Sequence, residues 1–350
     1  MKIKRIVSLL LVLVLAVSAI AVLGSCKKEE EKKTDNITVQ IGPNPETLDP
    51  ALNSAVDGGN MLITLFETLL IIDKDNKVQP GQAESYTVSP DGLTWTFTMR
   101  DGLKWSDGTE LNAKDFEYTM KRITDPDVGA SYGSTVVGMI EGYLDAAGNP
   151  DENGKPTTKP DRDKLNVKAS EDGKTLTIKL AYPCSYFDKI VAFGTMSPVQ
   201  KATVEKNGDK WATKPETYVC NGPYTITSWE HNSCITVKKN EHFVDAASIT
   251  MPEIKFYLSD DANNQLTNFK NGDWELIDDV PTNEIANLKK DYPDEFKIVG
   301  QIGTYYVCWN INENILPADS TLTGAEAEKA KEEIRNAIAL LFDRNYIVND

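Results

Sequence analysis

Hydrophobic and polar residues alternate in several short segments of the chain, and this period of two predicts β-strands. The clearest segment is 93–99, Leu-Thr-Trp-Thr-Phe-Thr-Met, which places its apolar side chains on one face and three threonines on the other. A Ser-Pro-Asp-Gly turn at 89–92 joins this segment to a strand expected at 86–88. We expect two more hairpins of the same construction at 165–180 and 224–238, and a first strand at 37–41.

Apolar residues at intervals of three and four predict two helices. One covers 59–70, and the other covers 325–343 with Ile334, Ala337, Ile338, Leu341 and Phe342 on its apolar side. The expected hairpins are separated by helices without a repeating strand–helix–strand rhythm. This order indicates a mixed α/β or α+β architecture built in layers.

The first 26 residues predict export from the cytoplasm. A basic start (Lys2, Lys4 and Arg5) precedes an uncharged apolar run at 6–23, and Leu-Gly-Ser-Cys closes the segment. This ending resembles the bacterial lipobox, in which the cysteine is lipidated and becomes the mature N-terminus. We therefore expect a signal peptide at 1–25, lipid on Cys26 and a solvated tether at 26–36. An uncleaved membrane-spanning helix is the alternative, because an apolar run of this length can cross a bilayer.

The composition disfavours several classes of function. The 350 residues include 37 Lys+Arg and 53 Asp+Glu, a net charge of −16, and so acidic a surface repels nucleic-acid phosphates. Two histidines leave little for a multi-histidine metal site. Motifs of the HExxH and CxxC types and phosphate-binding glycine loops do not occur. We expect neither an enzyme nor a bound metal or cofactor, and no nucleic-acid partner.

Four cysteines remain once Cys26 is assigned to lipid. They leave two alternatives open: bridges of the kind Cys184–Cys220 or Cys234–Cys308, or four buried thiols. A bridge between Cys220 and Cys234 is doubtful, because the hairpin between them separates the two residues along a strand by more than a disulfide spans.

Three blocks of residues together resemble one protein family. The first contains Thr-Leu-Asp-Pro at 47–50, Ser-Pro-Asp-Gly-Leu-Thr-Trp at 89–95 and Arg-Asp-Gly-Leu-Lys-Trp-Ser-Asp-Gly-Thr at 100–109. The second contains Cys-Asn-Gly-Pro-Tyr at 220–224 and Phe-Lys-Asn-Gly-Asp at 269–273, and the third Thr-Tyr-Tyr at 304–306 and Ile-Arg-Asn-Ala at 334–337. In order and spacing they resemble the solute-binding proteins of peptide ABC importers, of the oligopeptide- and dipeptide-binding type.

The resemblance implies a mixed α/β fold with two lobes around a hinge, of the periplasmic-binding-protein type, and an extra domain. By this resemblance, lobe I comprises residues 37–66 together with 201–302, and the extra domain comprises 67–200. Residues 303–350 are then the start of lobe II. Because the family chain continues further, we expect an amino-terminal fragment with a truncated second lobe. Such a chain should fold through about residue 300, fray beyond it and bind no peptide.

The resemblance also implies a function. The protein is expected to capture extracellular oligopeptides through backbone hydrogen bonds and to deliver them to the permease and ATPase subunits of an importer. It is expected outside the cytoplasmic membrane, held to its outer face by lipid. The alternative within the family is a non-peptide solute: nickel, haem, an opine or an oligosaccharide.

The ligand-contacting residues are also carried over from the resemblance. The segment that lies beside the peptide maps to Ser54, Ala55 and Val56. Tyr132 maps to a tyrosine from the extra domain, and Tyr305 or Tyr306 is expected to reach the ligand from a strand near the hinge, although a core role for one of them is equally compatible. The acidic residue that anchors the peptide amine is expected beyond Asp350.

Overall fold

The computed structural model describes residues 36–40, 42–151, 155–300, 303 and 306–345. The chain divides into two compact units, Met1–Ala286 and Asn287–Asp350, which are considered separately below.

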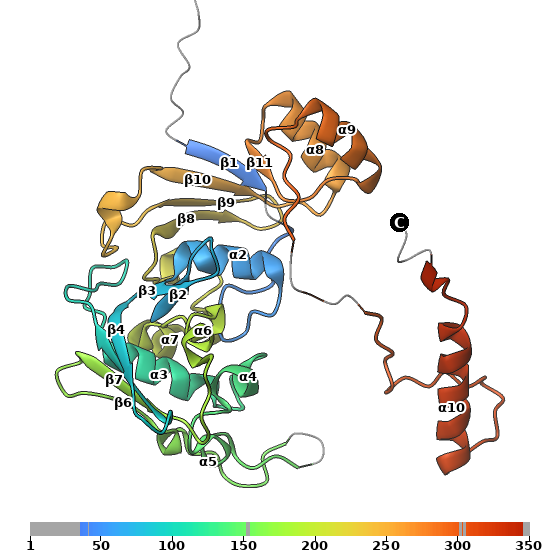
Figure 1. Cartoon of the computed structure of the whole chain (residues 1–350), viewed down its shortest axis with the longest axis horizontal. Coiled ribbons are helices and arrows are strands. Elements are labelled where there is room, and N and C mark those ends of the chain that lie inside the picture. The colour runs from blue at the N-terminus through green and yellow to red at the C-terminus, as the bar shows by residue number, and fades with distance from the viewer. Residues whose placement is uncertain (1–35, 41, 152–154, 301–302, 304–305, 346–350) are drawn as a thin grey trace, which may run out of the picture. The chain divides into compact units, whose positions relative to one another are not determined.

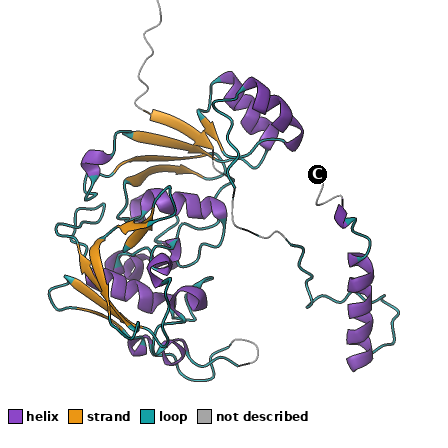
Figure 2. Ribbon diagram, in the orientation of Figure 1, coloured by secondary structure: helices purple, strands orange, loops and turns teal. Residues whose placement is uncertain are grey.

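Strands and short helices alternate along the first unit (Figures 1 and 2). The strands are β1 (Asn36–Gln40), β2 (Leu70–Ile72), β3 (Val78–Pro80), β4 (Ala83–Val88), β5 (Thr94–Met99), β6 (Val167–Ala169), β7 (Thr175–Lys179), β8 (Tyr224–Glu230), β9 (Cys234–Lys239), β10 (Glu253–Tyr257) and β11 (Leu276–Ile277). The helices are α2 (Val56–Leu65), α3 (Ala113–Ile123), α4 (Gly133–Val137), α5 (Tyr143–Ala147), α6 (Phe187–Ile190), α7 (Lys201–Asn207), α8 (Ala262–Asn271) and α9 (Ile285–Asp291), the last of which crosses the boundary between the units.

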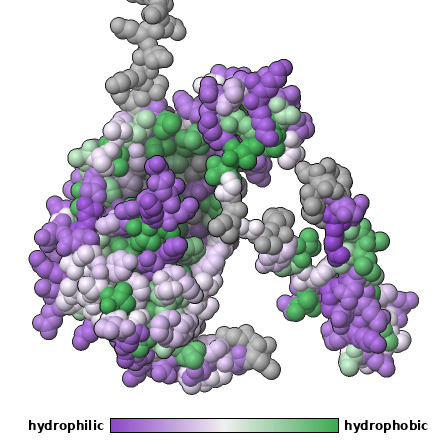
Figure 3. Space-filling view, in the orientation of Figure 1, coloured by the Kyte–Doolittle hydropathy of each residue, from purple (hydrophilic) through white to green (hydrophobic). Residues whose placement is uncertain are grey.

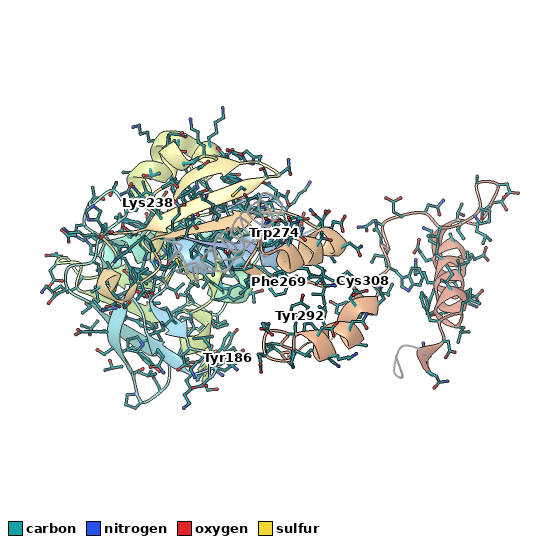
Figure 4. The ribbon with its side chains drawn as sticks, turned by 90° about the horizontal axis from the view of Figure 1, so that it is seen from above. Tyr186, Lys238, Phe269, Trp274, Tyr292 and Cys308 are labelled. Carbon is teal, nitrogen blue, oxygen red and sulfur yellow. The ribbon has the colours of Figure 1, made fainter. Side chains whose placement is uncertain are left out.

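A five-stranded sheet brings together strands from distant parts of the chain, in the order β11-β1-β10-β9-β8. β1 runs parallel to both β10 and β11, whereas β10, β9 and β8 pair antiparallel. Trp274 stacks on Tyr257 of β10 at 5.4 Å between ring centroids, and Figure 4 shows Trp274 where this sheet meets α8. The β8–β9 hairpin expected at 224–238 is confirmed.

A four-stranded antiparallel sheet, in the order β4-β5-β7-β6, contains the other two expected hairpins. Trp95 and Phe97 are buried on one face of β5 and lie opposite Ile178 and Leu176 of β7. α3 packs on β6 and β7 and buries Phe116 on the same apolar core. The alternation read from the sequence is therefore confirmed. A two-stranded sheet of β2 and β3 completes the unit.

The helix expected at 59–70 is shorter and begins earlier, at Val56–Leu65. Backbone hydrogen bonds from distant segments of the chain end the helix at Leu65. The Gly222 N–H donates to the Leu65 carbonyl at 2.9 Å, and the Gly81 and Ala83 N–H groups donate to the Leu69 carbonyl. Leu69 and Leu70 are buried outside the helix, Leu69 directly before β2 and Leu70 as its first residue.

In the second unit, α10 (Gly324–Ala339) is the helix expected at 325–343, and it ends four residues early. The Leu341 N–H bonds to the Ile338 carbonyl, three residues back, which tightens and ends the last turn. Leu341 is 83% exposed and Phe342 is 50% exposed. A shallow depression of about 590 Å³ lies between the loop 316–322 and Ile334 and Ala337 of α10.

The four described cysteines are free thiols, so neither considered pairing forms among them. Cys184 and Cys220 are buried, Cys234 is half-buried and Cys308 is exposed. Burial raises the pKa of the Cys220 thiol to about 12, which keeps it protonated and unreactive.

Candidate ligand-binding site

The segment expected to lie beside a ligand is exposed and stands at the start of a helix. Ser54, Ala55 and Val56 are all exposed, and Val56 is 79% exposed. Ala55 has an extended backbone (φ −109°, ψ 154°), and Val56 opens α2. The extended residue Ala55 therefore stands directly before α2.

A buried ion pair holds the loop that leads into this segment. The Asp49 carboxylate accepts hydrogen bonds from both terminal nitrogens of Arg122 in α3, at 3.0 and 2.6 Å. The Trp211 indole N–H and the Ala51 N–H also donate to it, each at 3.0 Å. The Asp49 side chain is 4% exposed and that of Arg122 is 10% exposed. Because every bond is made inside the core, the loop has little freedom to move.

A tyrosine fixes the residue before Asp49. The Tyr218 hydroxyl donates to the Leu48 carbonyl at 2.8 Å, and its ring stacks on Trp211 with 5.5 Å between centroids. Burial raises the pKa of Tyr218 well above its usual value, so the hydroxyl remains a donor. Asp49, Arg122, Trp211 and Tyr218 thus act as one anchor for residues 48–51.

The Cys-Asn-Gly-Pro-Tyr motif fixes the other end of α2. The side-chain amide of Asn221 accepts from the Glu67 N–H at 3.2 Å and donates to the Glu67 carbonyl at 2.9 Å. Gly222 packs so closely on the chain that a Cβ there would lie 2.5 Å from the Leu65 carbonyl carbon. The motif therefore has a structural role and does not offer a ligand contact.

Tyr132 lies beside the Asp49 loop. The hydroxyl of its neighbour Ser131 donates to the Leu52 carbonyl at 3.2 Å, two residues before Ser54. The Tyr132 ring packs edge-to-face on Phe193, with 5.3 Å between centroids and 81° between planes. The short 3-10 helix Gly194–Met196, directly after Phe193, contacts both α2 and α4. The fold thus brings Tyr132 close to the loop that leads to Ser54–Val56.

The remaining expected site residues, Tyr305, Tyr306 and Cys26, are not among the described residues of the first unit. Tyr305 and Cys26 lie outside the described residues. Tyr306 belongs to the second unit and is 72% exposed.

Sequence reasoning missed Arg122, Trp211 and Phe193. Arg122 and Trp211 meet Asp49 across 73 and 162 residues, so no spacing along the chain signals the contact. Phe193 follows a helix of four residues and shows no periodicity that would mark it as exposed.

The described part of the chain holds no group of three or more His, Cys, Asp or Glu side chains that could bind a metal ion. Among the described residues, no helix has the length and apolar character needed to cross a membrane. The visible face of the first unit is mostly hydrophilic, with hydrophobic side chains in separate patches (Figure 3).

Comparison with known proteins gives consistent matches. Residues 77–350 match the model of "Bacterial extracellular solute-binding proteins, family 5 Middle". The oligopeptide-binding protein OppA of Bacillus subtilis is 33% identical over 355 residues, which is 99% of this chain and 60% of the relative. The periplasmic oligopeptide-binding protein OppA of Salmonella typhimurium is 32% identical over 310 residues, 88% of this chain and 52% of the relative.

Comparison with solved structures gives matches to proteins of the same kind. Haemophilus influenzae OppA in complex with the peptide RPPGFSPFR has a TM-score of 0.68 and 28% identity, covering 75% of this chain and 50% of that one. The Burkholderia pseudomallei OppA structure has a TM-score of 0.67 and 27% identity, covering 74% of this chain and 49% of that one. The expected α/β fold of the periplasmic-binding-protein type is confirmed. The chain spans about half the length of the relatives it matches.

Proposed function

The chain belongs to family 5 of the bacterial extracellular solute-binding proteins, and from this premise we propose that the full-length protein captures peptides outside the cell for an ABC importer. Three of the relatives and solved structures described above carry the name oligopeptide-binding protein or contain a bound peptide. The proposed partners are extracellular peptides and the permease and ATPase subunits of the importer.

The observation that carries this proposal is the anchored, exposed segment Ser54–Val56. A binder that accepts many peptide sequences must read the peptide backbone, through hydrogen bonds of the kind that join neighbouring strands. Backbone groups can do so only if they are exposed and held in place. The Asp49–Arg122 pair holds the loop, and Ser54 and Ala55 remain exposed.

We assign the lobes on the same basis. The strands of the five-stranded sheet come from 36–40, 224–257 and 276–277, and those of the four-stranded sheet from 83–99 and 167–179. This separation supports lobe I as 37–66 with 201–302 and an extra domain at 67–200. Residues 303–350 then belong to lobe II, to which we assign Tyr305 and Tyr306.

The proposed location is outside the cytoplasmic membrane, with Cys26 lipidated and residues 26–36 as a tether. This proposal rests on the basic start, the apolar run and Leu-Gly-Ser-Cys at 23–26. A single acyl chain gives only weak membrane attachment, so stable anchoring at Cys26 requires more than one chain.

Native mass spectrometry of the full-length protein, purified without denaturation, tests the proposed function. We expect bound masses that fragment as peptides of mixed sequence. Retention of a single non-peptide solute, such as haem or an oligosaccharide, would contradict the proposal and favour the alternative within the family.

A further inference from the structure

Phe193 presents an aromatic surface beside the proposed peptide-binding segment. Its side chain is 44% exposed, although it packs edge-to-face on Tyr132. The backbone is held on both sides, because the Phe193 N–H donates to the Ile190 carbonyl at 3.0 Å and the N–H of the buried Met196 donates to the Phe193 carbonyl at 2.8 Å. The ring is therefore held in place with its free surface in water, where contact with an apolar group is favourable.

The segments that meet at Phe193 carry acidic side chains, and the exposed Lys189 of α6 lies four residues before it. The three segments that meet here are 52–63, 125–137 and 191–196, and their charged residues are Asp57, Asp125 and Asp127. Asp125 already faces Arg162 at 3.6 Å. The nearby Arg122 is engaged by Asp49 inside the core. An acidic side chain placed against the Phe193 ring would lose part of its hydration and gain no hydrogen bond from the ring.

We propose that Phe193, supported by Tyr132, is a specificity-determining residue that favours peptides with a bulky apolar side chain at one position and disfavours an acidic side chain there. This inference rests on the proposed peptide-binding function and adds a side-chain preference to backbone recognition. The occupant is the side chain of one bound peptide residue, preferably phenylalanine or leucine.

The test uses full-length protein and pentapeptides of alanine in which each position in turn is replaced by Phe, Leu or Asp. We expect one position at which Phe raises the affinity roughly tenfold over alanine, the scale of discrimination that a small apolar contact gives. Asp at the same position should bind more weakly than alanine. Phe193→Ala should remove most of the preference for Phe over alanine, whereas Phe193→Leu should keep part of it.

The matched control is Tyr182→Ala. Tyr182 is 55% exposed, and its neighbour Pro183 packs against Gly92 in the turn before β5, so this ring belongs to a different contact. The control should keep the preference for Phe in full.

The possible outcomes distinguish a failure of the proposed peptide-binding function from a failure of the proposed role of Phe193. If the wild-type protein binds no peptide of the set or of other sequences, the proposed function is wrong. If it binds peptides but shows no preference at any position, or if Phe193→Ala keeps the full preference, the role of Phe193 is wrong and the peptide-binding function stands.

Discussion

Asp49 and Arg122 form a bidentate ion pair inside the first unit, with N–O distances of 3.0 and 2.6 Å, across 73 residues of sequence. The pair joins the loop before Ser54 to α3, a helix of the proposed extra domain. The backbone that we propose to face the ligand is thereby attached to the core through the buried side chains of Asp49 and Arg122.

Removing one partner of this pair should destabilise the fold strongly. Arg122→Ala leaves the Asp49 carboxylate buried without its two charged donors, which typically costs about 3–5 kcal/mol of unfolding free energy. Urea denaturation measures the change. Lys174→Ala is the matched control, because it removes an ion pair at the surface: the side chain of Lys174 is 66% exposed and that of its partner Asp101 is 93% exposed. This substitution should change the free energy of unfolding by less than about 1 kcal/mol. Equal effects of the two substitutions would show that the Asp49–Arg122 pair contributes no more to the free energy of unfolding than an exposed ion pair does.

Gly222 should tolerate no side chain. Because a Cβ would lie 2.5 Å from the Leu65 carbonyl carbon and 2.6 Å from the Phe66 nitrogen, Gly222→Ala should force the end of α2 away and cost about 2 kcal/mol or more. Gly59→Ala, in the interior of α2, meets only the Asn53 side chain at 3.8 Å and should be neutral or stabilising by up to about 1 kcal/mol. Thermal unfolding of both variants checks the contrast. A stable Gly222→Ala protein would contradict the close packing.

Asp115 should make stability depend on pH. Burial raises its pKa from 3.8 to about 6, against the lowering effect of the hydrogen bond from the Asn112 N–H. The folded state therefore holds the proton more tightly, and this contribution to stability is full below about pH 3.8 and is lost as the pH rises through 6. Asp115→Asn keeps an acceptor for the Asn112 N–H and removes the titration.

The stability of Asp115→Asn relative to wild type should therefore increase between pH 4 and pH 7, by about 1–2 kcal/mol. Asp91→Asn should behave differently, because hydrogen bonds from Ser89 and the Leu93 N–H lower the pKa of Asp91 below 3.8. The stabilising contribution of Asp91 is therefore present above pH 3.8 and is lost as the pH falls below it, so the difference between Asp91→Asn and wild type should change little between pH 4 and pH 7. A flat difference for Asp115→Asn across this range would refute the assignment.

Hydrogen exchange of the 350-residue chain should differ sharply between β5 and α10. β5 pairs with strands on both sides and buries Trp95 and Phe97, whereas within α10, which is described throughout, Ala327 alone is buried. Amides at 94–99 should exchange slowly and those of α10 quickly. Slow exchange throughout α10 would show that its apolar side is covered.

Lipidation should depend on Cys26 alone. Palmitate labelling of cells that produce the full-length protein should disappear in Cys26→Ala and persist in Cys308→Ala, which removes an exposed thiol. Labelling that survives Cys26→Ala would overturn the lipoprotein assignment.

Strands with one buried face could be predicted from the sequence, because the period of two in Leu93–Met99 directly reflects which side chains face the core. The end of α2 could not be predicted from the sequence. Residues 66–70 continue the helical pattern, and the backbone bonds that end the helix come from Gly222, Gly81 and Ala83.

The candidate site, too, could be predicted from the sequence only in part. The Thr-Leu-Asp-Pro motif located the loop, but its physical role depends on Arg122 and Trp211, which only the fold brings to Asp49. Phe193 carries no signal in the sequence, since its role follows from exposure and from contact with Tyr132.

Calorimetry on the full-length protein tests backbone recognition most directly. The ligands are peptides of one length with scrambled sequences, and the same peptides with N-methylated backbone amides, which cannot donate hydrogen bonds. We predict affinities within about tenfold of one another for the scrambled set, and a loss of about 1 kcal/mol or more for each N-methylation at a contacted amide. Unchanged affinity after N-methylation at every position, or a sugar or metal ion that binds more tightly than every peptide, would contradict the account.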